Sequence, residues 1–175
     1  MLFAYCVSLL ALTACSTYSA NRYSPSTDNI LAFKALKGRS INVGAFTAST
    51  PAQDRIACRA AGPIKTPDGE TYSEYIRKAM IDEMKLAEIY DAKTPVTLTG
   101  NLNSLDFDSM GGLWKINMTL SSSNGKSMTV NEQYKYSASF FAESGCANTA
   151  QAFTPAVQNM VGKAIAAPEF RTLIK

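Results

Sequence analysis

Residues 113–136 read LWKINMTLSSSNGKSMTVNEQYKY, and this stretch decides the fold. Apolar side chains alternate with polar ones on both sides of Asn124-Gly125, the pattern of two strands with one buried and one exposed face. A two-residue turn there would set apolar side chains opposite polar ones, whereas a three-residue loop, Ser123 to Gly125, aligns them and gives Gly125 a left-handed conformation. The expected facing pairs are Leu120 with Met128, Met118 with Val130 and Trp114 with Tyr134.

Two further strands are predicted on the N-terminal side of this hairpin. Apolar residues alternate with polar or small ones over about 40–47 and again over 96–102. The apolar parity then changes to Leu105 and Phe107, which indicates a bulge near Asn103-Ser104. Between the first two strands, residues 48–69 are expected to form a long loop.

Two helices are indicated by apolar stripes at helical spacing. The first begins at a capping box, in which the Thr71 hydroxyl suits the N–H of Glu74 and the Glu74 side chain suits the N–H of Thr71, and runs to about residue 88. The second carries a stripe over 153–165, where Pro155 suits the first turn of a helix capped by Thr154. A start nearer Asn148 would require a kink at the proline.

The resulting order, β-α-β-β-β-α, predicts an α+β fold. We expect a two-layer sandwich in which a mainly antiparallel four-stranded sheet carries both helices on one face. The other face is rich in Thr, Asn and Gln, so it is a candidate binding face as well as an ordinary solvated surface. Its candidate binding residues are Thr97, Thr99, Asn101, Lys115, Asn117, Thr119, Asn131, Gln133 and Lys135.

The N-terminal residues predict export and membrane attachment. Residues 1–14 form an apolar stretch of signal-peptide type, and Leu12 to Cys15 resembles the lipobox of bacterial lipoproteins. The resemblance implies that Cys15 is lipidated, and Ser16 after it resembles an outer-membrane sorting signal. Residues 15–28 are then expected to form the lipidated cysteine and a flexible tether, and 29–175 a single globular domain.

Cys58 and Cys146 are the two thiols left in the exported domain. In an oxidising periplasm they are expected to form a disulfide, which would pin the 48–69 loop beside the second helix. A redox-active or metal-binding pair is the alternative, although the two cysteines lack C-x-x-C spacing.

Composition excludes several chemistries. The chain has no histidine, which removes Ser-His-Asp and Cys-His catalysis and His-containing zinc sites. A net charge of +3, with both signs interspersed, gives no nucleic-acid footprint. Asp106, Asp108 and Glu132 are the carboxylates considered for hydrolysis, and Glu132 needs either a cationic partner or a place at the sheet margin. We expect no enzymatic activity, no cofactor and no metal.

In lipobox and element order the chain resembles small bacterial outer-membrane lipoproteins. These are the YajG type and the accessory lipoproteins of envelope lipid transport, and no functional residue carries over from them. The leading hypothesis is a noncatalytic lipoprotein on the periplasmic side of the outer membrane, held by Cys15 and acting as an accessory or assembly subunit of another envelope protein. The alternative is glycan or peptidoglycan binding by the polar sheet face.

Overall fold

The computed structural model describes residues 16–36, 38–50 and 53–175. Two sheets and four α-helices make up an α+β fold. The helices are α1 (Thr27–Lys34), α2 (Tyr72–Leu86), α3 (Ala142–Ala166) and α4 (Phe170–Leu173), with a short 3-10 turn, η1 (Pro67–Gly69). The strands are β1 (Tyr18–Ser19), β2 (Asn42–Ala48), β3 (Arg55–Cys58), β4 (Gly62–Lys65), β5 (Thr97–Asp108), β6 (Leu113–Ser122) and β7 (Ser127–Lys135).

The predicted hairpin of β6 and β7 is confirmed residue by residue. Leu120 pairs with Met128, and the other two expected pairs also form. The N–H of Gly125 donates to the main-chain oxygen of Ser122 at 2.9 Å, and Gly125 has a φ of +83°. This left-handed conformation is the reason that glycine suits the position.

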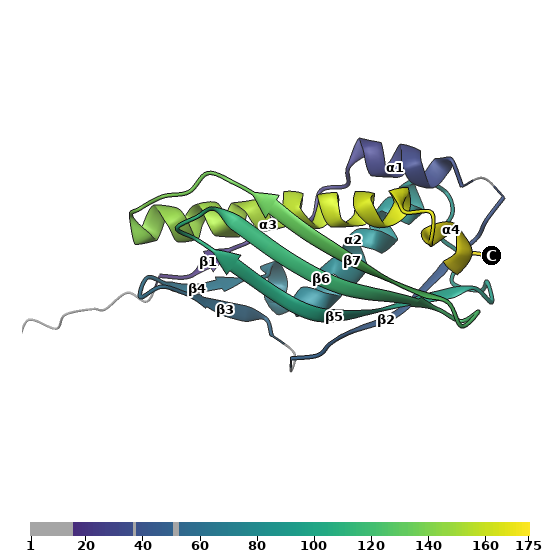
Figure 1. The fold of residues 1–175 in the computed structure, drawn as a ribbon, viewed down its shortest axis with the longest axis horizontal. Coiled ribbons are helices and arrows are strands. Elements are labelled where there is room, and N and C mark those ends of the chain that lie inside the picture. Colours follow the sequence, from purple (N-terminus) through teal and green to yellow (C-terminus); the bar gives the residue numbers. More distant parts are fainter. Residues whose placement is uncertain (1–15, 37, 51–52) are drawn as a thin grey trace, which may run out of the picture.

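The main sheet has the strand order β2-β5-β6-β7. β2 runs parallel to β5, and the other neighbours are antiparallel. The register between β5 and β6 shifts between Leu102 and Ser104, which confirms the predicted bulge. The sheet lies in front of α2 and α3 in Figure 1, so the two long helices cover one face and leave the other open.

The core lies between this sheet and the two helices. Trp114 of β6 is fully buried, and its ring centroid lies 5.0 Å from that of Phe153 in α3. Tyr72 of α2 meets Phe153 edge to face at 5.1 Å. One aromatic cluster therefore joins a strand to both helices, which fixes the spacing of the two layers.

α2 begins as the sequence predicts. The Thr71 hydroxyl accepts a hydrogen bond from the N–H of Glu74 at 3.2 Å. The Glu74 carboxylate instead accepts from Arg77 at 2.9 Å, and Arg77 also donates to the main-chain oxygen of Gly44 in β2. The helix cap is thereby linked to the edge strand of the sheet.

α3 begins at Ala142, thirteen residues before Pro155, so the prediction that Pro155 lies in its first turn is wrong. Pro155 lies inside the helix, where it supplies no N–H. Phe153 before the proline and Val157 after it are fully buried, as is Cys146 in the first turns of the helix. Their packing keeps the helix continuous, which sequence propensity alone does not indicate.

The expected loop at 48–69 contains a hairpin instead. β3 and β4 pair antiparallel through a tight turn, and β1 adds parallel to β4, so the second sheet has the order β1-β4-β3. Ile56 faces Ile64, which is fully buried. The prolines hid this strand signal, because Pro63 pairs in β4 without donating a main-chain N–H.

The flexible tether expected over 15–28 is also not what the described residues show. β1 pairs with β4, Ala20 is buried, and the main-chain oxygen of Asn21 accepts from the Tyr75 hydroxyl at 3.0 Å. The Ser, Thr, Asn and Pro content that suggested a tether thus belongs to a segment that contacts the body of the protein. The predicted signal peptide and the predicted lipidation site, Cys15, lie outside the described residues.

Candidate functional site

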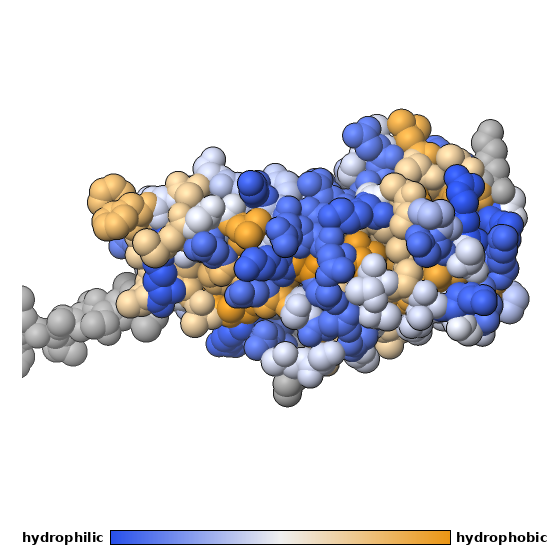
Figure 2. Space-filling view, viewed as in Figure 1, coloured by the Kyte–Doolittle hydropathy of each residue, from blue (hydrophilic) through white to orange (hydrophobic). Residues whose placement is uncertain are grey.

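The predicted binding residues share the face of the main sheet that the helices leave open. All of them are exposed or half-buried. Hydrophilic side chains gather over the middle of the molecule in Figure 2, which has the same view as Figure 1 and looks onto the sheet. The structure therefore brings together Thr97, Thr99 and Asn101 of β5, Lys115, Asn117 and Thr119 of β6, and Asn131, Gln133 and Lys135 of β7.

A row of side-chain amides crosses this face from β7 to β5, and we call it the amide row. It consists of Asn131, Asn117, Asn103 and Asn101. Asn101 donates to the side-chain oxygen of Asn103, Asn103 to that of Asn117, and Asn117 to that of Asn131. Asn101 also donates to the Ser49 hydroxyl at 2.8 Å. The row ties the edge strands to the centre of the sheet on the solvent side.

The amide row uses most of its own hydrogen-bonding capacity. An asparagine amide has two N–H donors. Those of Asn103 point to Asn117 and to the Thr119 hydroxyl, which lies 2.9 Å away, and those of Asn101 point to Ser49 and Asn103. A ligand that needs donors at these two positions would have to break existing bonds.

The second half of β5 has an open edge. β2 is paired with β5 only as far as Ala48, which lies beside Leu102. From residue 103 to 108, β5 pairs with β6 on one side, and no other strand in the described ranges pairs with it on the other. Because an unpaired strand edge presents free main-chain donors and acceptors, this half can accept another strand.

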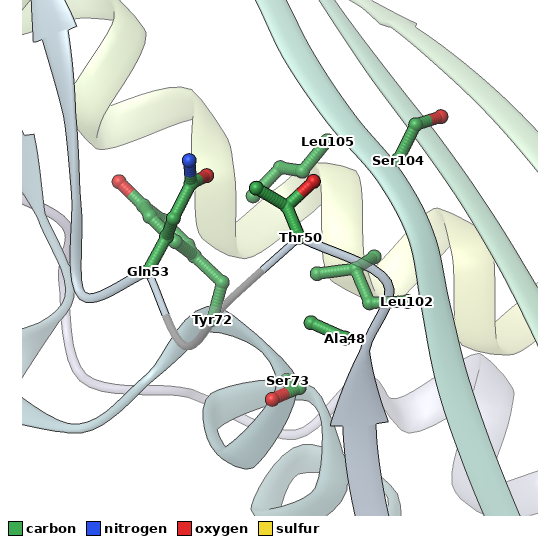
Figure 3. Close-up of a pocket in the computed structure, with 8 residues that line it drawn as sticks. All are labelled: Ala48, Thr50, Gln53, Tyr72, Ser73, Leu102, Ser104 and Leu105. Atoms are coloured by element: carbon green, nitrogen blue, oxygen red, sulfur yellow. The ribbon is translucent and has the colours of Figure 1, made fainter.

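A pocket opens beside this edge. Its volume is about 140 Å³, and Figure 3 shows the side chains around it. Tyr72 and Ser73 come from the start of α2, while Leu102, Ser104 and Leu105 come from β5. Ala48, Thr50 and Gln53 complete the lining. The pocket is similar in size to a cavity of about 150 Å³ that holds a benzene-sized molecule.

The predicted disulfide is present. Cys58 and Cys146 are bonded, and their Cα atoms lie 6.0 Å apart. Next to the bond, Arg59 donates from Nε to the Ser109 hydroxyl and from its two terminal nitrogens to the main-chain oxygens of Phe140 and Ser139, each at 2.9 Å. The disulfide and Arg59 together hold the β3–β4 turn, the β5–β6 turn and the start of α3.

The carboxylates considered for hydrolysis do not meet in one pocket. Asp106 is exposed on β5. Asp108 accepts from the N–H groups of Gly111 and Met110, and these two hydrogen bonds hold its pKa below the usual value. Asp108 therefore caps the β5–β6 turn.

Glu132 lies on the opposite, buried face of the edge strand β7. It is 6% exposed and forms an ion pair of 2.9 Å with Lys163 of α3. Glu132 therefore lies at the sheet margin and also has a cationic partner. The two alternatives that the sequence raised are both present. Among the described residues, no group of three acidic or cysteine side chains is arranged to hold a metal ion.

Several residues of these sites were missed by sequence reasoning. Asn103 was assigned to the bulge, although its side chain is central to the amide row. Leu105 indicated only that the alternation of apolar and polar residues shifts by one position. The open edge beside it depends on where β2 ends. The Arg59 contacts join residues 50 and 81 positions apart, and no local pattern predicts them.

One comparison with solved structures supports the fold. The chain is similar to a crystal structure described as protein XCC0632 from Xanthomonas campestris, of the family DUF330, with a TM-score of 0.55 and 14% sequence identity. The similarity covers 86% of this chain and 95% of the other. No family model and no curated protein matches the sequence. At this identity the likeness concerns the fold alone.

Proposed function

We propose that the protein is a noncatalytic envelope lipoprotein, held to the outer membrane through Cys15 and facing the periplasm, that binds another envelope protein as an accessory subunit. The observation that carries this proposal is the open half of β5 with a pocket at its side. An extended segment of the partner adds to the strand edge and places a small apolar side chain in the pocket. Main-chain hydrogen bonds supply affinity in this mode, and the pocket supplies specificity.

The pocket composition fits such a segment. Leu102 and Tyr72 are buried beneath it, and Leu105 is half-buried at its rim. Ser73 and Ser104 add hydroxyl groups at the same place. A short aliphatic side chain therefore meets an apolar floor.

The opposite edge of the sheet is less suited to strand addition. Lys163 of α3 reaches over β7 and donates to the main-chain oxygen of Asn131 at 2.7 Å. The same ammonium group pairs with Glu132. A lysine on an edge blocks further pairing, because a new strand would have to displace a charged group. The open edge of β5 and the blocked edge of β7 can thus be compared directly in a binding experiment.

Photocrosslinking in intact envelopes tests the proposal. A benzophenone amino acid at position 105 or 107 is expected to capture one defined protein, whereas the same group at Thr129 of β7 is not. Cys15→Ala should abolish capture, since the untethered chain no longer meets its partner at the membrane. Equal capture from Thr129, or capture that is unchanged by Cys15→Ala, would contradict the proposal.

A second candidate function is glycan or peptidoglycan binding by the polar sheet face, supported by its Thr, Asn and Gln side chains. The amide row weighs against it, because the donors of Asn101 and Asn103 are already used. Sedimentation with purified sacculi separates the two. Binding that is lost in Asn117→Ala and kept in Leu105→Ala would favour the glycan function.

A further inference from the structure

Three exposed apolar side chains lie at one end of the molecule. Phe140 is 84% exposed, Phe141 is 75% exposed and Met110 is 61% exposed. In Figure 2 an apolar group protrudes at this end, over the start of α3. Burying apolar surface away from water has a favourable free energy, which these exposed side chains do not gain. A surface that covers them would therefore be stabilising.

Arg59 joins the segments that carry the three side chains, which we call the apolar patch. Its terminal nitrogen lies 2.9 Å from the main-chain oxygen of Phe140, and its Nε lies 2.9 Å from the hydroxyl of Ser109, the residue before Met110. Cys58, the neighbour of Arg59, is bonded to Cys146 in the first turns of α3. The patch is therefore held on a covalently braced part of the fold.

The point where the described chain begins lies at the same end. The main-chain oxygen of Ser16 occupies the place that a Cβ on Gly62 would need, and Gly62 pairs with Cys58 across the β3–β4 turn. Cys15 directly precedes Ser16 in the sequence. β1 then fastens the chain to β4, which leaves no long spacer between Cys15 and the patch.

We propose that Phe140, Phe141 and Met110 insert into the surface of the lipid bilayer that holds the anchor. This inference rests on the lipidation of Cys15 in the proposed function. An acyl anchor on Cys15 places this end of the protein at the membrane surface, where Phe side chains can be buried at the boundary between headgroups and acyl chains. The insertion adds a second attachment to the acyl chains and fixes the orientation of the sheet relative to the membrane.

The exposed leucines of the described chain provide an internal control. Leu31 in α1 is 59% exposed and Leu86 at the end of α2 is 53% exposed. Neither is joined to the Arg59 contacts. A nonspecific attraction of exposed apolar groups to lipid would act on these two residues as well, whereas the proposed docking acts on Phe140 and Phe141.

The test uses the lipidated full chain, purified from envelopes and reconstituted in vesicles of phosphatidylethanolamine and phosphatidylglycerol. The vesicles contain a phosphatidylcholine with a diazirine in its acyl chain, and mass spectrometry locates the photolabel. Labelling is expected at Phe140, Phe141 and Met110, several times stronger than at Leu31 and Leu86. Phe140→Ser with Phe141→Ser should lower the labelling of Met110, and Leu31→Ser with Leu86→Ser should not.

The mass of the N-terminal peptide is measured in the same sample. If Cys15 carries lipid, two results would overturn the proposed insertion without touching the anchor. They are equal labelling of all exposed apolar residues and the absence of label at 140 and 141. Chain-to-chain crosslinks at 140 and 141 without lipid label would identify a second copy as the occupant and overturn it too. An unmodified Cys15 would remove the anchor on which the inference rests.

Discussion

The indole N–H of Trp114 donates a hydrogen bond of 2.8 Å to the main-chain oxygen of Thr149. Trp114 lies near the start of β6, an inner strand of the sheet, and Thr149 lies in the N-terminal half of α3. The bond is fully buried, and the Thr149 hydroxyl also contacts that of Tyr136 at 2.7 Å. One polar contact inside an aromatic cluster therefore sets the position of α3 along the sheet.

Replacing Trp114 with Phe should lower the free energy of unfolding by about 2–3 kcal/mol, because it leaves a small cavity and removes the donor to Thr149. Urea denaturation followed by far-UV circular dichroism measures this change. Tyr136→Phe is the control, with an expected loss of about 1 kcal/mol for a half-buried hydrogen bond. Equal losses in the two variants would contradict a dominant role for the indole contact.

Glu83 of α2 is fully buried and holds the N-terminal segment. Its Oε1 accepts from the Tyr23 hydroxyl, the N–H of Ser26 and the amide of Asn29. Burial raises the pKa of this carboxyl above 4.5, and the three hydrogen bonds offset only part of that rise. Glu83→Ala should cost about 2–4 kcal/mol, because it leaves buried donors unpaired. Glu83→Gln keeps an acceptor and should cost less than about 1 kcal/mol at pH 7.

The raised pKa of Glu83 also predicts a pH dependence. The folded protein binds the proton more tightly than the unfolded chain, so the stabilising effect is complete below the ordinary carboxyl pKa of 4.5 and is lost as pH rises through the raised value. Unfolding curves of the wild type and Glu83→Gln should therefore diverge as pH increases above 4.5. Parallel pH profiles would show that Glu83 does not titrate in this way.

The disulfide should contribute strongly to stability. Cys58 and Cys146 are 88 residues apart in sequence, and a crosslink over that length stabilises by roughly 4–5 kcal/mol in the chain-entropy description. Cys58→Ala with Cys146→Ala should lower the urea midpoint accordingly, and wild type treated with reductant should match the double variant. A reduced wild type as stable as the oxidised protein would contradict this expectation.

Pro155 interrupts the hydrogen bonding of α3 without ending the helix. Pro155→Ala restores one N–H donor and removes the ring clash with the preceding turn, so we expect a gain of about 1–2 kcal/mol. Differential scanning calorimetry measures the shift in midpoint. Asn159→Ala, at an exposed position one turn later, controls for the helix propensity of alanine. A lower midpoint for Pro155→Ala would mean that the packing of α3 requires the proline.

Sequence patterns predicted the parts of the fold that local chemistry controls. The β6–β7 register followed from matching apolar pairs and the loop at Gly125, and the start of α2 followed from Thr71. The start of α3 could not be predicted, because a proline inside a segment normally indicates that a helix begins or ends there. In the structure, the packing of Cys146 and Phe153 against distant parts of the chain keeps the helix continuous. The β3–β4 hairpin was hidden for a similar reason, since its partners are a distant strand and a disulfide.

The candidate sites were predicted less completely. Alternation along β5, β6 and β7 placed the polar face correctly, because residues two apart share a face of a sheet. The open edge of β5 depends on the length of β2, and the apolar end depends on contacts of Arg59 with three separate segments. Such features arise only when distant parts of the chain are brought together.

The parallel pairing of β1 with β4 has a mechanical consequence. A pull on Ser16 away from the body loads the contacts of Tyr18 and Ser19 with β4 along the strand, so that they resist together instead of opening one by one. β4 passes the tension to β3, and the Cys58–Cys146 bond carries it into α3. Force that enters at the N-terminus thus passes through the β3–β4 hairpin and reaches the longest helix through a covalent link.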